Sequence, residues 1–168
     1  HRVEKIIGET LLLQGLSKQQ TRARIIQLLD DVGIPSPEDK LRRYLHELSG
    51  GQRQRVMIAM ALALDPDILI ADEPTTALDV TLQAQILDLL QSLQRSRNMA
   101  MILISHDLNL VRRYANQVVV MNQGLVVEQG DVTEIFTHPK QAYTQNLLNH
   151  DFGAAIEVND TDAILTLT

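Results

Sequence analysis

Hydrophobic residues follow helical spacing in the first third of the chain. They recur every three or four positions over 2–16 and again over 18–32, where Ser17 precedes the run as a candidate N-cap. Gly33 ends this pattern, and after a proline-containing turn a further, mostly helical stretch is expected over 38–48. The pattern therefore predicts an all-helical N-terminal part.

Helices alternate with short apolar runs after the glycine pair at 50 and 51. Three helices are expected, over 52–64, 80–97 and 107–115. The runs 68–71 and 99–104 have the length and composition of buried parallel strands. This alternation predicts an α/β fold with a parallel sheet.

The residue pattern in the last third of the chain predicts a hairpin, two short helices and a C-terminal segment without helical periodicity. Residues 117–121 and 125–129 flank Asn122-Gln123-Gly124, which favours a hairpin at the margin of the sheet. The helices are expected over 132–137 and 141–149. The acidic stretch 151–162 lacks periodicity and is interpreted as a linker, whereas 164–168 alternates as a strand would.

Composition excludes several classes of protein. The 168 residues include 15 basic and 21 acidic side chains, a net charge of −6, which disfavours a bulk nucleic-acid binder. The absence of cysteine removes disulfides, thiolate metal sites and cysteine nucleophiles. The longest apolar run, Val56 to Leu64, is far shorter than the about 18–20 residues of a membrane span.

Ser49-Gly50-Gly51-Gln52 is the most specific segment. Two glycines let the backbone approach a ligand closely, and the following helix presents unpaired N–H groups at the positive end of its dipole. Together these features favour an anion site. The alternative is a glycine turn before a core helix.

Polar side chains follow both predicted strands of the core. Asp72 and Glu73 end the first, where an Asp can hold Mg²⁺ through water and a Glu can orient or deprotonate an attacking water. His106 follows the second strand at the same edge, and this cluster favours phosphoryl chemistry. The alternatives are a solvated acidic turn and a loop histidine.

Asp79 is a good N-cap for the helix over 80–97.

These segments, in this order, resemble the motifs of ABC ATPases. Leu48–Gln52 is similar to the signature motif, Ile68–Glu73 to Walker B with its catalytic glutamate, Thr76–Asp79 to the D-loop, and His106 to the switch histidine. The resemblance implies a partial P-loop NTPase fold. It implies a helical subdomain at 1–50, the C-terminal part of the ATPase core at 51–150, and a linker with the first strand of a following domain at 151–168.

Two further segments resemble one subgroup of ABC ATPases. Residues 72–80 and His138-Pro139 with Tyr143-Thr144-Gln145 are similar to the ATPases of dipeptide, oligopeptide and nickel importers, and the tail resembles the linker of a fused two-ATPase subunit. The resemblance implies ATP hydrolysis coupled to solute uptake, on the inner face of the cell membrane. It implies two kinds of partner, a second ATPase domain facing the first head to tail and transmembrane permease subunits, and no nucleic acid.

The resemblance also assigns a role to each candidate residue. Ser49, Gly50, Gly51, Gln52 and Asp79 would meet nucleotide, the signature residues serving the ATP of the partner domain. Asp72 would hold Mg²⁺ through water, Glu73 would act on the attacking water, and His106 would meet the γ-phosphate.

The phosphate-binding Walker A motif, Gly-x-x-x-x-Gly-Lys-[Ser/Thr], occurs nowhere in the 168 residues. Because that loop supplies most of the contacts to the β- and γ-phosphates, these residues alone are not expected to turn over ATP. Two alternatives to an importer ATPase remain open. One is an interaction module that docks on a membrane protein without chemistry, and the other is an ABC ATPase of DNA repair or translation.

Overall fold

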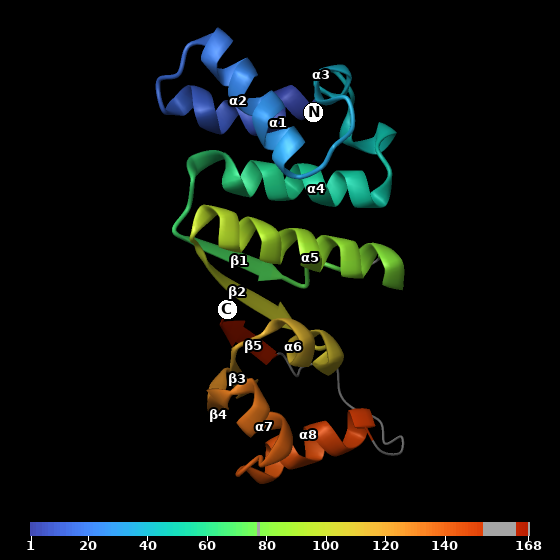
Figure 1. Cartoon of the computed structure of the whole chain (residues 1–168), viewed down its shortest axis with the longest axis vertical. Coiled ribbons are helices and arrows are strands. Elements are labelled where there is room, and N and C mark those ends of the chain that lie inside the picture. Colours follow the sequence, from blue (N-terminus) through green and yellow to red (C-terminus); the bar gives the residue numbers. More distant parts are fainter. Residues whose placement is uncertain (77, 153–163, 168) are drawn as a thin grey trace. The chain divides into compact units, whose positions relative to one another are not determined.

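The computed structural model describes residues 1–76, 78–152 and 164–167, and the chain forms two compact units (Figure 1). The first unit contains residues 1–69 and 74–99, and the second contains residues 70–73 and the chain from residue 100 onward.

The first unit is built from helices, and those predicted over 2–16, 18–32, 52–64 and 80–97 are confirmed. They are α1 (Val3–Leu13), α2 (Lys18–Asp31), α3 (Pro37–Lys40), α4 (Gly50–Ala61) and α5 (Val80–Arg97), with short 3-10 turns η1 (Leu45–Glu47) and η2 (Leu62–Leu64). Ser17 caps α2 as predicted, because its Oγ accepts the Gln20 N–H at 3.3 Å.

The mostly helical stretch predicted over 38–48 is confirmed only at its two ends, by α3 and by the 3-10 turn η1. The regular helix α3 ends at Lys40, and the chain beyond it pairs with the start of α1. The N–H of Val3 donates to the carbonyl of Arg43 at 2.9 Å, and the N–H of Glu4 donates to that of Leu41 at 3.0 Å. These carbonyls satisfy the unpaired donors at the start of α1 instead of propagating a helix of their own.

Apolar faces of the helices form the core of the first unit. Its fully buried large side chains come from α1, α2, α5, the segment after α3, and η2; they are Ile7, Leu11, Leu28, Leu29, Leu41, Leu62, Ile86, Leu87 and Leu90. At the C-terminal end of α5, Arg97 binds the carboxylates of Asp31 at 2.5 Å and Asp65 at 2.8 Å. Asp31 ends α2, so this cation joins the C-terminal ends of two helices.

Five strands form one sheet in the order β1-β2-β5-β3-β4, and the predicted strands are confirmed. They are β1 (Ile68–Asp72), β2 (Ala100–Ser105), β3 (Gln117–Asn122), β4 (Leu125–Asp131) and β5 (Ile164–Leu167). The tail strand β5 lies between β2 and β3 and is antiparallel to both, so β2 and β3 run in the same direction. This strand order joins β1 and β2, whose arrows point the same way in Figure 1, to the antiparallel pairings of β2 with β5, β5 with β3 and β3 with β4. The sheet is therefore mixed and not the parallel sheet expected from the alternation, whereas the α/β class is confirmed.

The burial predicted for the first strand is only half right. Leu69 and Ala71 are buried, but Ile68 is 56% and Ile70 is 64% exposed. Side chains alternate between the two faces of a strand, and β1 stands at one end of the strand order. One face of this strand is therefore left uncovered by the described residues.

The hairpin and the helices of the second unit agree with the sequence pattern. Gln123 and Gly124 both have positive φ, 48° and 76°, as a tight two-residue turn between β3 and β4 requires. The helices are α6 (Leu108–Tyr114), α7 (Val132–Thr137) and α8 (Ala142–Phe152), and their apolar residues pack on Val118 and Val120 of β3. Of the predicted linker, residues 153–162 lie outside the described residues, and 151–152 belong to α8.

Glu128 of β4 holds the start of α8. Its carboxylate accepts the N–H groups of Lys140 at 2.7 Å and Gln141 at 3.1 Å, immediately before the helix. Partial burial raises the pKa of Glu128, but these hydrogen bonds and the nearby Lys140 charge leave the pKa below its usual value of 4.5.

Glu128→Gln is expected to lower the melting temperature at pH 7 by about 2–4 °C, because an amide cannot accept at both positions as a carboxylate does. Since the folded pKa lies below the unfolded one, the advantage of the wild type is present above pH 4.5 and is lost as pH falls through the folded pKa. Thermal unfolding from pH 7 to pH 3 measures this, with Glu38→Gln on exposed α3 as the control. A difference that persists undiminished at pH 3 would contradict the assignment.

Candidate functional site: a strand-end carboxylate pair and a capped signature helix

Glu73 and His106 lie together where two neighbouring strands end. Glu73 follows β1 with φ of 44°, a left-handed conformation that costs a non-glycine residue about 1–3 kcal/mol. Its N–H donates to the carbonyl of Ile104 in β2 at 2.9 Å, which holds this turn against the neighbouring strand. His106 comes directly after Ser105, the last residue of β2.

The two side chains form a hydrogen-bonded pair. Glu73 Oε1 lies 2.6 Å from His106 Nδ1 and accepts the His106 backbone N–H at 3.0 Å. An ionised carboxylate can only accept, so a hydrogen bond between these atoms forms when the ring proton is on Nδ1. The Glu73 side chain is 33% exposed and that of His106 is 73% exposed, so both remain accessible to solvent or a ligand. The predicted neighbourhood of Glu73 and His106 is confirmed.

Asp72 is the last residue of β1 and is exposed, next to Glu73 in sequence. Within residues 1–76, 78–152 and 164–167, no three His, Asp or Glu side chains come together as a set of metal ligands. An Mg²⁺ ion held through water needs only one or two protein carboxylates, because magnesium retains most of its water. Asp72 can supply one such carboxylate, and its role as a metal ligand stays a prediction.

The signature segment forms the start of α4 in the first unit. Ser49 is the N-cap: its Oγ accepts the Gln52 N–H at 3.2 Å, and the Gln52 side chain accepts the Ser49 N–H at 3.4 Å. This capping box satisfies the third helical donor and leaves the N–H groups of Gly50 and Gly51 at the positive end of the helix. These donors fit the phosphate oxygens of a nucleotide.

The two glycines of the signature lie against leucines on either side of Asp79, the residue before α5. A Cβ at position 50 would lie 3.6 Å from Leu78 Cδ2, and one at position 51 would lie 3.2 Å from Leu82 Cδ2. Asp79 is confirmed as the N-cap of α5, since its Oδ1 accepts the Leu82 N–H at 3.0 Å. The sequence pattern did not identify these leucines as part of the site. The only signal was their position beside the cap Asp79, with Leu78 one residue before it and Leu82 three residues after it.

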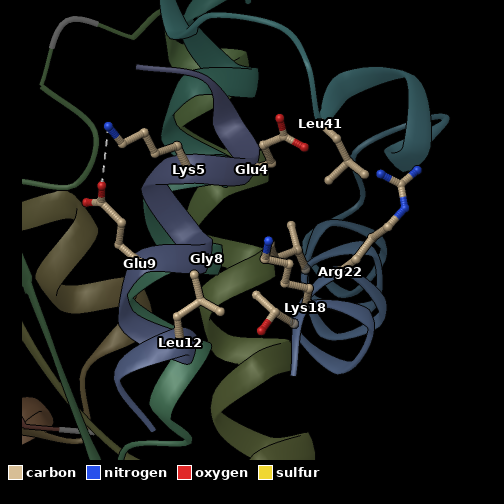
Figure 2. Close-up of a pocket in the computed structure, with 10 residues that line it drawn as sticks. Glu4, Lys5, Gly8, Glu9, Leu12, Lys18, Arg22 and Leu41 are labelled. Carbon is tan, nitrogen blue, oxygen red and sulfur yellow. Dashed lines mark ion pairs between the residues drawn. The ribbon is translucent and has the colours of Figure 1, made fainter. Parts of the chain in front are cut away.

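A separate cavity of about 440 Å³ lies between α1 and α2, with α1 contributing Glu4, Lys5, Gly8, Glu9 and Leu12 to its lining (Figure 2). Lys18 and Arg22 reach it from α2, and an ion pair joins Lys5 to Glu9 at 3.6 Å. None of the predicted site residues lines this cavity.

The cavity makes Gly8 a site for stabilisation. A Cβ there would lie 3.2 Å from Ile25 Cδ1, the end of a side chain that lines the cavity. Because alanine is favoured over glycine inside a helix by about 1 kcal/mol, Gly8→Ala is expected to raise the melting temperature by about 2–4 °C. Gly15→Ala is the opposing control, because φ of 81° at Gly15 is unfavourable for alanine. A lower melting temperature for Gly8→Ala would show that Ile25 cannot move.

The fold and these two groups of residues define the class of protein. A paired glutamate and histidine at adjoining strand ends, with a capped Ser-Gly-Gly-Gln helix in the same chain, are features of an ABC ATPase. The family profile described as ABC transporter matches residues 2–76. The chain is therefore similar to the ATP-binding proteins of the ABC transporter family.

Several relatives are similar over most of this chain. The peptidoglycan transport ATP-binding protein YejF of Agrobacterium fabrum is 56% identical over 88% of the chain, and the dipeptide transport ATP-binding protein DppD of Escherichia coli is 58% identical over 80%. The alignments cover 27% and 41% of those relatives, so the chain spans less than half of their length.

A solved structure supports the same fold. The bacterial ABC transporter cassette MJ0796, described as a dimeric structure, superposes with a TM-score of 0.67 at 27% identity. The superposition covers 79% of this chain and 57% of the cassette. The prediction of a partial ABC ATPase fold is confirmed. Among the described residues, no helix is both long and apolar enough to span a membrane.

Proposed function

We propose that these residues form part of the ATP-binding subunit of an ABC importer, which couples ATP hydrolysis to uptake of peptides or a similar solute. The observation that carries the proposal is the hydrogen-bonded pair of Glu73 and His106 at the end of β1. The proposed domains are a helical subdomain at 1–50, core at 51–150, and a linker with the first strand of a following domain at 151–168. In this structure that strand, β5, pairs with β2 and β3 of the core.

ATP and Mg²⁺ are the proposed cofactors, and the chain supplies part of their site. When bound, Mg²⁺ neutralises charge that develops on the phosphates. Asp72 would hold the ion through water, and Glu73 would orient and deprotonate the attacking water. His106 would contact the γ-phosphate and, through Nδ1, hold the Glu73 carboxylate in place.

Ser49, Gly50, Gly51 and Gln52 would serve the nucleotide of a second ATPase domain, arranged head to tail with this one. Support comes from the N-terminus of α4, where the capping box leaves the Gly50 and Gly51 N–H groups as donors for an anion, and from the dimeric cassette that shares the fold. Asp79 would act at the same interface, beside the signature segment.

The remaining proposed partners are transmembrane permease subunits, with the ATPase on the cytoplasmic face as a peripheral subunit. The transport functions named for the relatives support this arrangement. Nucleic acid is not a proposed partner, because a net charge of −6 opposes binding to phosphate backbones.

The proposed function is tested with the full-length subunit and its permease in sealed vesicles. Peptide uptake that requires ATP, together with hydrolysis that rises when the permease is present, is the expected result. Hydrolysis that responds to DNA or ribosomes instead of the permease would overturn the proposal in favour of a non-transport ABC ATPase.

Alone, the 168-residue chain is expected to bind ATP–Mg only weakly and not to hydrolyse it. The reason is the missing glycine-rich loop, whose backbone and lysine make most contacts to the phosphates. Calorimetric titration of the chain and of the full-length subunit under the same conditions checks this. Micromolar affinity of the chain alone, or phosphate release abolished by Glu73→Gln, would contradict the expectation.

A further inference from the structure

Gly50 and Gly51 have ordinary helical conformations, so backbone freedom does not explain them. Positive φ occurs at Gly15, Gly33 and Gly124 but at neither signature glycine. Another factor must therefore favour glycine here, and the structure shows one on the side facing α5.

Leu82 fills the space that a side chain at position 51 would need. A Cβ there would meet three of its atoms, Cδ2 at 3.2 Å, Cδ1 at 3.7 Å and Cγ at 4.0 Å. The first distance is tighter than ordinary van der Waals contact. Gly51 itself is buried, and the one Cα hydrogen that a Cβ would replace points at this leucine.

The backbone of Leu82 is fixed by the D-loop residue before α5. Its N–H donates to Asp79 Oδ1 at 3.0 Å, so the Asp79 cap sets where the first turn of α5 begins. On the other side of that cap, Leu78 covers Gly50. The two leucines thus set the first turn of α5 directly against the first turn of α4.

We propose that Leu82 is a positioning residue for the signature: its side chain, docked on Gly51, holds the N-terminus of α4 in the position from which the Gly50 and Gly51 N–H groups bind phosphate. This inference rests on the proposed function, because it assigns how the same site is held. Leu82 acts through α4 and is not itself a ligand of nucleotide.

The test is a double-mutant cycle of Gly51→Ala and Leu82→Ala in the full-length subunit, measured as kcat and KM for ATP. Gly51→Ala is expected to lower kcat about tenfold or more, because small misplacements of positioning groups have large effects. Leu82→Ala alone is expected to lower kcat several-fold. In the double variant the alanine methyl occupies the space left by the leucine, so kcat should return toward the wild-type value.

Matched controls separate positioning from general destabilisation. Leu89→Ala removes a leucine of similar burial from the same helix and should leave kcat unchanged, whereas Leu82→Met should retain most of the activity. If Leu82→Ala does not rescue Gly51→Ala, the added methyl acts on the nucleotide itself and the proposal is overturned. Equal losses of kcat in Leu82→Ala and Leu89→Ala would overturn it too.

The failure of the proposed function is distinguishable from the failure of this inference. A wild-type subunit without ATPase activity would contradict the function alone. The same double-mutant cycle, measured by thermal unfolding of the 168-residue chain, would still test the contact between positions 51 and 82. Coupled residues give non-additive shifts of the melting temperature. Additive shifts would show that positions 51 and 82 do not interact, which would overturn the inference.

Discussion

Replacing Glu73 by glutamine is expected to lower ATP hydrolysis by the full-length subunit about 100-fold or more, while ATP binding is retained. The carboxylate is needed as the attacking water is activated, whereas binding depends on other groups. Glutamine keeps the side-chain volume and an oxygen that can accept the His106 N–H, so the turn after β1 should persist.

Steady-state hydrolysis and equilibrium binding of ATP check this expectation on the same preparations. Glu134→Gln is the matched control, because it makes the same change on α7, where Glu134 pairs with Lys140. A Glu73→Gln variant that hydrolyses ATP at the wild-type rate would show that Glu73 is a structural turn residue. A loss of binding equal to the loss of hydrolysis would contradict its proposed role in the chemical step.

Gly51→Asp in one of two paired ATPase domains is expected to abolish nucleotide-driven closure at the opposite domain's phosphate loop. A carboxylate at the positive N-terminus of α4 would stand near the γ-phosphate that the helix is proposed to bind. The structure adds a second effect, because the Cβ of that residue would also press on Leu82 at 3.2 Å.

The two effects are separated by Gly51→Asn, which matches aspartate in shape but has no charge. The asparagine variant should show the packing effect alone, and the additional loss in Gly51→Asp measures repulsion of phosphate. Site-specific crosslinking with a photoreactive ATP analogue reports which site fails to close. A deficit at the mutated domain's own phosphate loop, with the opposite site intact, would show that the head-to-tail assignment of residues 49–52 is wrong.

Local pattern was sufficient for most of the secondary structure. Ser17, Ser49, Asp79, Asp107 and Asp131 each cap a helix with their own side chain, and a cap depends only on residues two or three positions away. The turn at Gln123 and Gly124 is equally local. Such elements can be predicted from a single sequence because the interactions that form them lie within one turn of chain.

The helical prediction for residues 38–48 is wrong in the middle of the segment, because the outcome there depends on a distant part of the chain. Propensity favours a helix there, but the carbonyls of Leu41 and Arg43 accept N–H groups from α1, some 37–40 residues earlier in the chain. Exposure of Ile68 and Ile70 also depends on which elements cover β1. Neither result is encoded in the local alternation of apolar and polar residues.

The sequence by itself determined the types of residue at the candidate site and their order along the chain, because motif spacing and strand ends are local features. The tertiary structure decided that Glu73 Oε1 meets the His106 ring at 2.6 Å and that Leu82 fills the space beside Gly51. Both contacts join residues about 30 positions apart. Their geometry follows from strand pairing and helix packing, which no short window of sequence specifies.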